Sequence, residues 1–530
     1  MLAALGQPDR GLIVCIFAYL FGYSGFFFAL MSVKSRFLRL CFSFLWMFGV
    51  QLHQLSWLGT TTYHGAAIVL VYLWMAAWFA IHLAIVALFI PKTKNITYSR
   101  GAAMASLWAI FEVSRIHTFC GFPFNNLGLV LTSSPYSMQV ASVAGIFGLS
   151  FWVVLCAAWG ARFFRDRRVL SGVVWGSVVF IPFLFSLYQI YDHLPKLEKE
   201  KQIKVAAVQT GLAVEQKWRF PKDEGTYIEP FDQWKGIYSL MANANQDSFD
   251  LIVLPEVALP GPAFNADLPF NAVVEEIIKF DHRLPALSER VAESDPKGRW
   301  YVSHAWMGQA LANLYKSELV MGLLDQNEDL DEYYNAAFHF VPFRDSVHRY
   351  EKRVLVPLAE YLPLPIMKSF LDKYGITDFF TPGRQAKVFM GQTPLSVSIC
   401  YEEGYSNLMR EARLLGAKLF VNVSNDGWFP KSRLTQEHFN LGKVRCVENG
   451  VPLVRSCNTG VTAVVDSLGF VRDSMAEVNS RGEINTGIVI SSVSSYGYST
   501  LFSYFGNSLI VVISILILLW FFLYRKTLKL

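Results

Sequence analysis

Three side chains that could together carry out acyl transfer stand at the ends of short apolar runs. Residues 251–254 lead to Glu256, residues 395–399 lead to Cys400, and Lys352 follows a third apolar stretch after a turn. A cysteine thiolate is a strong nucleophile, and a carboxylate can remove the thiol proton. An ammonium can stabilise the negative charge that develops on an attacked carbonyl. Each residue alone is more often structural. Together the three supply the parts of an acyl-transfer site, although their spacing by itself does not establish one.

These side chains meet only if the chain folds so that the apolar runs become neighbouring strands. Between about Gln202 and Ser491, short β-branched runs alternate with helical patterns, an order that indicates an α/β fold. Ligands of open α/β sheets lie outside the carboxyl ends of the strands, so we expect Glu256, Cys400 and the pair Asn425-Asp426 at one edge. A helix that starts after Cys400 is expected to stabilise its thiolate. The expected strands are 203–208, 251–254, 319–324, 395–399, 418–423, 452–455 and 462–465.

The composition indicates a membrane protein. Of the 530 residues, 53% are hydrophobic and 17% are charged, whereas an average soluble domain has roughly 25% charged residues. Long runs almost free of charged residues predict membrane spans near 11–33, 38–58, 65–90, 101–119, 139–160, 169–191 and 508–524. The expected organisation is a membrane domain of about six helices (1–193), a water-facing α/β domain (194–491), and a final span with its tail (492–530).

Positive charge is concentrated in alternate loops between these spans, which predicts the direction of the chain. Because Lys and Arg near span ends favour the cytoplasmic side, the odd-numbered loops and the C-terminus are expected inside and the α/β domain outside. The net charge of +5 lies largely in these loops, and no nucleic-acid motif accompanies it. The basic clusters are Lys34, Arg36 and Arg39; Lys92, Lys94 and Arg100; Arg162, Arg165, Arg167 and Arg168; and Arg525, Lys526 and Lys529.

The fourth expected span contains two charged residues, Glu112 and Arg115. They are three residues apart, so they lie on one helix face and can pair. Ionisable residues inside a membrane are rare and usually have a function. Two interpretations are open: a structural clamp between helices, or a contact with a lipid headgroup or substrate near the break at Cys120-Gly121-Phe122-Pro123.

Four short motifs resemble successive motifs of the nitrilase superfamily: Val205–Gln209, Leu254-Pro255-Glu256, Tyr350-Glu351-Lys352 and Ile399-Cys400-Tyr401-Glu402. With the flanking spans and the motifs 424–429 and 458–463, the chain is similar over nearly its whole length to the membrane-embedded branch of that superfamily, the bacterial apolipoprotein N-acyltransferases. The resemblance implies a nitrilase-like α-β-β-α sandwich beside a multi-span α-helical membrane domain.

The resemblance also implies a reaction. Cys400 would carry a fatty acyl chain as a thioester from a phospholipid to the amine of the diacylglyceryl-cysteine that begins an apolipoprotein. Glu256 would be the general base, and Lys352 would stabilise the oxyanion. A bacterial inner membrane, a periplasmic catalytic domain, a monomer, and the lack of any cofactor or metal are further implications. Positions that the family treats as essential support are matched by Trp218, Glu360, Tyr401 and Glu402.

Three other functions fit part of the pattern. A membrane-anchored nitrilase-type amidase would hydrolyse a small C–N bond with the same residues, although one anchoring helix would then suffice. A Cys–His hydrolase would use His438 and would leave Glu256 and Lys352 unexplained. A scaffold or transporter that only binds lipid would not need these catalytic side chains.

Overall fold

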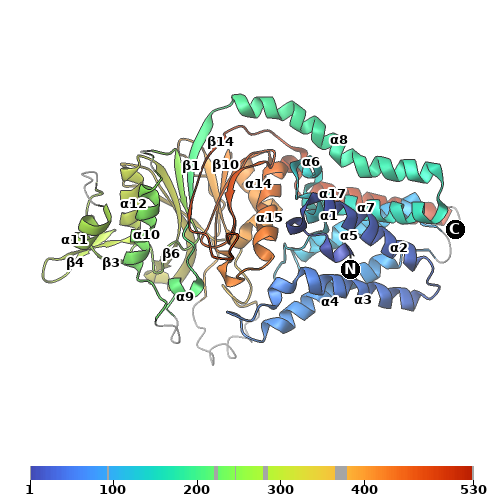
Figure 1. Ribbon diagram of the computed structural model, residues 1–530, viewed down its shortest axis with the longest axis horizontal. Helices are drawn as coiled ribbons and strands as arrows, with labels where there is room; N and C mark the ends of the chain where they lie inside the picture. The colour runs from blue at the N-terminus through green and yellow to red at the C-terminus, as the bar shows by residue number, and fades with distance from the viewer. Residues whose placement is uncertain are drawn as a thin grey trace.

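A helical bundle and a pair of facing β-sheets lie side by side in the computed structural model (Figure 1). The structure describes residues 2–91, 95–219, 225–244, 246, 248–278, 284–363 and 379–527. Of the basic residues used to predict topology, Lys92, Lys94 and Lys529 lie outside these ranges.

Each expected membrane span coincides with a helix. In the first span, α1 (Gly11–Phe17) and α2 (Ser24–Leu30) flank the π-helical segment η3 (Ala18–Tyr23) without a break. The others are α3 (Arg36–Gln54), α4 (Ile68–Ala87), α5 (Tyr98–Arg115), α7 (Ala141–Asp166), α8 (Val169–Lys199) and α17 (Ser508–Thr527). Within the described residues, the first span, α4, α7 and α8 are long and apolar enough to cross a membrane, and α17 is a shorter apolar helix. That α3 and α5 also cross it stays a prediction.

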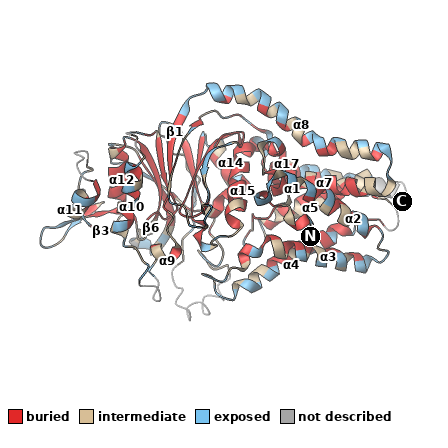
Figure 2. Cartoon of the chain, viewed as in Figure 1, coloured by how far each residue is buried: buried red, intermediate tan, exposed pale blue. Residues whose placement is uncertain are grey.

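The outer faces of the bundle, where Figure 2 shows exposed residues, carry large apolar side chains. On α8, Leu184 and Tyr191 are 63% and 84% exposed, and on α17 Leu516 and Leu523 are 59% and 62% exposed. The central helix α7 is mostly buried. Large apolar side chains that face outward in such continuous bands mark contact with lipid or protein. Together with helices of spanning length, they identify a membrane protein.

The other half of the molecule contains two larger sheets, with orders β14-β1-β2-β6-β7-β8 and β13-β12-β11-β10-β9, and a small sheet β3-β5-β4. The first consists of β1 (Gln202–Gln209), β2 (Leu251–Leu254), β6 (Glu318–Asn327), β7 (Glu332–Phe340), β8 (Val347–Glu351) and β14 (Gly487–Ser494). The second consists of β9 (Leu395–Ile399), β10 (Leu419–Ser424), β11 (Leu453–Cys457), β12 (Thr462–Val465) and β13 (Val471–Met475). The small sheet consists of β3 (Ala266–Pro269), β4 (Ala292–Ser294) and β5 (Trp300–Ser303).

Alternating side chains of the central strands build the predicted α-β-β-α sandwich. In β1, Val205 and Ala207 belong to the core between the two sheets, where they are joined by Val421 of β10. Ala206 and Val208 point the other way, into the core that β1 shares with α10 (Pro230–Ala242) and α12 (His304–Leu314). The second sheet is covered by α14 (Ser406–Leu414) and α15 (Leu434–Asn449). Strands buried on both faces have to be apolar throughout, which is why the sequence reveals them.

Helix α15 lies between the second sheet and the membrane helices (Figure 1). Nearly every residue of α15 is buried. A Glu448 carboxylate oxygen accepts a hydrogen bond from the main-chain N–H of Ile146, in α7, at 2.8 Å. The turn after β9 is joined to the bundle as well, since the Tyr401 hydroxyl donates to the Gly121 carbonyl at 3.0 Å. The sandwich is therefore fixed to the bundle by buried polar contacts.

The bounds of the seven expected strands agree with observed strands to within one residue, apart from β6 and β11, which end three and two residues later than expected. The sequence did not reveal the small sheet β3-β5-β4, nor β7, β8, β13 or β14. β8 and β13 lie at sheet edges and β13 is largely exposed, so polar residues are tolerated there. β14 pairs with β1 from almost 300 residues further along the chain. The expected domain boundary at residue 194 falls inside the last turns of α8.

We expect Val421→Ala to destabilise the sandwich, because Val421 is fully buried between the sheets. Removing its two methyl groups should lower the free energy of unfolding by about 2 kcal/mol. The matched control is Val471→Ala on the exposed strand β13, which should change it by less than about 0.5 kcal/mol. Thermal unfolding of the purified proteins in detergent measures both, and equal effects would contradict the assigned core.

Candidate active site

Glu256, Lys352 and Cys400 are carried by two facing sheets. Glu256 follows β2 and Lys352 follows β8, both in the first sheet, whereas Cys400 follows β9 in the second. The expectation that the polar groups share the edge of one sheet is therefore wrong for Glu256. It is right for Cys400 and the pair Asn425-Asp426, which follow the neighbouring parallel strands β9 and β10. The ends of strands from both sheets of a sandwich can face the same space, and the site is built there.

The ammonium of Lys352 lies between two carboxylates. Its Nζ is 3.3 Å from Glu256 Oε1 and 2.9 Å from Glu360 Oε1. Asn335, in β7, donates from its side-chain amide to the same two oxygens, at 2.8 and 3.0 Å. Lys352 is only 1% exposed. Burial disfavours the ammonium, but the carboxylates of Glu256 and Glu360 outweigh it and hold the pKa of Lys352 above its ordinary value, so the side chain is charged.

Cys400 begins the five-residue 3-10 turn η10 (Cys400–Gly404), and its backbone is left-handed, with φ 50°. Burial raises the pKa of its thiol, and the Glu256 carboxylate raises it further, while Lys352 opposes both. The expectation that a helix start stabilises the thiolate is wrong in this respect: the turn is short, α14 begins only at Ser406, and burial dominates. The resting sulfur is therefore a thiol that needs a base.

Glu402 connects the strand ends that carry Lys352 and Cys400. It is fully buried and accepts hydrogen bonds from the main-chain N–H of Ile399 at 2.8 Å and of Arg353 at 2.6 Å. The Tyr350 hydroxyl donates to its carboxylate at 2.9 Å. These donors flank Cys400 on one side and Lys352 on the other. Glu402 therefore fixes the spacing of the two sheets at the site.

The other two predicted supporting residues lie further from the reactive groups. Tyr401 packs its ring against Phe124, with centroids 5.7 Å apart, and so holds the turn against the membrane domain. Trp218 is half-buried at the end of α9 (Val214–Lys217). Among the described residues, no hydrogen bond or ring contact joins its side chain to Glu256, Lys352 or Cys400, so a supporting role for Trp218 stays a prediction.

A second buried charged cluster lies behind Cys400. The His438 ring is 2.7 Å from Asp426 and 3.0 Å from Glu403, and its Nε2 lies 3.1 Å from the Cys400 carbonyl oxygen. The guanidinium of Arg455 contacts both carboxylates, at 2.9 and 3.3 Å. Burial alone would lower the pKa of His438, but Glu403 and Asp426 raise it to about 9.

The charge state of this cluster decides between two chemistries. An imidazolium has no lone pair with which to take a proton, so His438 does not serve as the base of a Cys–His hydrolase at neutral pH.

Donor atoms of Cys400, Asp426 and His438 lie within 4.8 Å of one another, as in a metal site. However, the two carboxylates of the cluster are already balanced by Arg455 and His438, so a cation would add unmatched charge.

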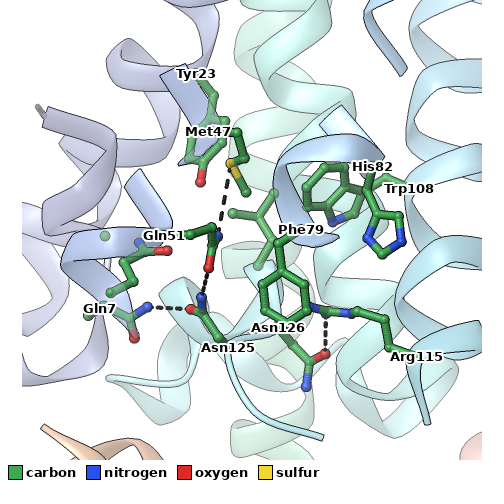
Figure 3. Close-up of a pocket in the computed structure, with 13 residues that line it drawn as sticks. Gln7, Tyr23, Met47, Gln51, Phe79, His82, Trp108, Arg115, Asn125 and Asn126 are labelled. Atoms are coloured by element: carbon green, nitrogen blue, oxygen red, sulfur yellow. Dashed lines mark hydrogen bonds between the residues drawn. The ribbon is translucent and has the colours of Figure 1, made fainter. Parts of the chain in front are cut away.

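Glu112 and Arg115 form a buried ion pair inside the membrane domain. Their side chains are 3.4 Å apart, and Arg115 donates to the Asn126 side chain at 2.9 Å (Figure 3). Glu112 accepts from the main-chain N–H of Leu127 at 2.8 Å. The adjoining cavity holds about 10 Å³, which is space for about one water molecule and not for a lipid headgroup. The geometry thus favours the structural interpretation.

Comparison with protein families agrees with this architecture. Residues 204–511, more than half of the chain, match the family described as carbon-nitrogen hydrolase. The chain belongs to that family. Residues 1–159 match a second family, described as the apolipoprotein N-acyltransferase N-terminal domain. The resemblance to the nitrilase superfamily and its membrane-embedded branch is confirmed.

Curated proteins with similar sequences match both the membrane bundle and the sandwich of this chain. A protein named apolipoprotein N-acyltransferase from Chlamydia pneumoniae is 28% identical over 97% of this chain and 94% of its own. Proteins of the same name from Geobacter metallireducens and Rickettsia prowazekii are 28% and 25% identical, over 80% and 90% of this chain and 75% and 88% of their own. The sequence similarity to these proteins therefore covers residues of both the bundle and the sandwich.

We expect Glu256→Gln to lower the pH at which Cys400 is alkylated. The carboxylate raises the pKa of the thiol, so its neutral replacement makes the thiolate easier to form. The rate of carbamidomethylation of the peptide that contains Cys400, measured by mass spectrometry against pH, should rise at a lower pH than in the wild type. The control is Glu411→Gln, which removes a carboxylate of α14 that pairs with Arg353. An unchanged profile in Glu256→Gln would contradict the geometry.

Proposed function

We propose that the protein transfers a fatty acyl chain from a phospholipid, through a thioester on Cys400, to the N-terminal amine of diacylglyceryl-cysteine in apolipoproteins. The observation that carries the proposal is a half-buried cysteine beside a buried lysine and glutamate, on a turn that is hydrogen-bonded to the membrane bundle through Tyr401 and Gly121. An acyl donor that diffuses in a bilayer can reach such a site without leaving the lipid. The names of the relatives supply the acceptor.

In the first step, the Cys400 sulfur attacks the ester carbonyl carbon while Glu256 takes the thiol proton. The Lys352 ammonium has three donors, of which two are engaged by Glu256 and Glu360, so one is left for the carbonyl oxygen as it becomes an oxyanion. When the tetrahedral adduct collapses, its bond to the glycerol oxygen breaks. Glu256 returns the proton to that oxygen, and a lysophospholipid leaves.

In the second step, the amine of diacylglyceryl-cysteine attacks the thioester carbonyl. Glu256 accepts a proton from the amine nitrogen, Lys352 again faces the oxyanion, and the carbon–sulfur bond breaks. The Cys400 thiolate then regains its proton from Glu256, and an amide is formed. Two successive transfers allow two bulky lipids to use one pocket in turn.

The acyl-enzyme is the decisive species to detect. Purified protein incubated with phospholipid should gain one fatty-acyl mass on the peptide that contains Cys400, and addition of a diacylated lipopeptide should remove it. Cys400→Ala should abolish the adduct, whereas Cys156→Ala, which replaces a buried cysteine of α7, should retain it. Release of ammonia from simple amides without any acyl adduct would instead support the alternative, a membrane-anchored nitrilase-type amidase.

We further propose that the protein is a monomer in the bacterial inner membrane, with the sandwich in the periplasm and the C-terminus in the cytoplasm. The alternation of basic loops supports this direction. A cysteine replacing Leu330, which is exposed in the turn after β6, should then react in whole cells with a maleimide that enters the periplasm but cannot cross the inner membrane.

The matched control is a cysteine replacing Val169, exposed at the start of α8 on the opposite side, which should react only after the cells are opened. Both variants are made with the exposed Cys120 replaced by Ser. Labelling of Val169→Cys but not Leu330→Cys in whole cells would invert the topology.

A further inference from the structure

A second lysine, Lys217, is buried next to Glu256. It ends the short helix α9, its side chain is fully buried, and its Nζ lies 3.3 Å from the main-chain carbonyl oxygen of Glu256. The reaction described above gives it no part. A buried lysine costs stability unless the structure uses its charge or its hydrogen-bond donors.

The carbonyl that Lys217 contacts belongs to a strained turn. The next residue, Val257, has φ 39°, a left-handed conformation that is strongly disfavoured for a β-branched side chain. Strain of this kind persists only where the surroundings hold the backbone in place. On one side the turn is held by β6, where Gly322 donates to the Pro255 carbonyl at 3.1 Å and accepts from the Ala258 N–H at 2.7 Å. On the other side, Lys217 binds the Glu256 carbonyl.

Cys400 shows a related arrangement, in which the left-handed residue is the nucleophile itself and not the residue after it. The main-chain carbonyl of Cys400 is contacted by a buried cationic side chain, His438, at 3.1 Å. In both places the side chain that faces the reaction is aimed by a backbone that would relax if its carbonyl were released. The contact of Lys217 with Glu256 thus has a counterpart at the nucleophile.

We propose that Lys217 is a positioning residue of the acyl-transfer site, whose Nζ holds the Glu256 carbonyl and so keeps the carboxylate aimed at Cys400 and Lys352. This inference rests on the proposed function, because it assumes that Glu256 is the base of that reaction. Lys217 touches neither the sulfur nor the acyl group in this scheme.

The energetics of Lys217 agree with a role in activity. Burial lowers the pKa of its ammonium to about 7, and the nearby Glu256 carboxylate opposes this shift only in part. An ammonium whose pKa is lowered in the folded protein destabilises the fold at pH values below its ordinary pKa. Residues that reduce stability and yet serve a site are expected to show opposite effects on stability and activity when they are replaced.

The test is Lys217→Met, which retains length and apolar bulk but removes the charge and the donors. We expect the rate of thioester formation on Cys400 to fall at least tenfold while the phospholipid KM changes less than about twofold. The melting temperature should stay the same or rise. Lys217→Arg, which retains a cationic donor, should recover part of the rate.

The matched control is Lys443→Met, which removes another buried lysine, one that lies against the Phe439 ring in α15. Its rate should stay within about twofold of the wild type. If Lys217→Met does not fold, Lys217→Gln is measured in the same way. A rate within about twofold of the wild type, or a rate that falls only together with the melting temperature, overturns the proposal.

Failure of the proposed function gives a different result. If wild-type protein forms no thioester on Cys400, the acyl-transfer scheme is wrong whatever the Lys217 variants do. If the wild type forms the thioester and Lys217→Met forms it equally fast, the scheme stands and only the positioning role falls.

Discussion

The structure around the site depends on one constraint, which is that the Lys352 ammonium is held away from water between two carboxylates. A buried charge is tolerated only when it is paired and its hydrogen bonds are satisfied. Glu256 and Glu360 supply the charge, and Asn335 orients both carboxylates. None of these groups can move far without leaving another unpaired, and this rigidity fixes where a carbonyl oxygen would have to lie to be stabilised.

Several features of the fold serve that constraint. Glu402 binds backbone N–H groups beside Lys352 and beside Cys400, so the two sheets cannot slide past each other at the site. The positively charged pair His438 and Arg455 balances the carboxylates behind Cys400. The nucleophile and the turn after the base are both left-handed, which a loosely packed scaffold would not maintain. A site of this kind requires the four-layer packing that surrounds it.

The sequence predicted those parts of the protein whose signal is local. Apolar β-branched runs revealed the buried strands β1, β2, β9 and β10, and charge-free runs revealed the helices of the bundle. Glu256, Lys352 and Cys400 were found from motifs. The structure places Lys352 against Glu256, and the charges of both side chains shift the pKa of the Cys400 thiol.

Other parts depend on contacts between distant segments and were missed. Asn335 lies on β7, which was not predicted, and Glu403 and Arg455 are 52 residues apart in the chain but joined by a buried ion pair. Lys217 carried no signal beyond its position beside Trp218. The prediction that a helix start stabilises the Cys400 thiolate was wrong, because the sequence does not show how strongly burial raises the pKa of the sulfur. The placement of strand ends from two facing sheets is likewise a property of the packed sandwich and not of any single run.

The position of α15 has a consequence for how the two halves of the protein can be handled. This helix is enclosed by the second sheet on one side and by membrane helices on the other, and it bears His438 and Glu448 within it. A soluble fragment made by cutting the chain near residue 200 and before α17 would uncover that apolar and charged surface together. Engineering a water-soluble version of the catalyst would therefore require a redesigned outer face of α15, because removal of the hydrophobic segments alone would not provide one.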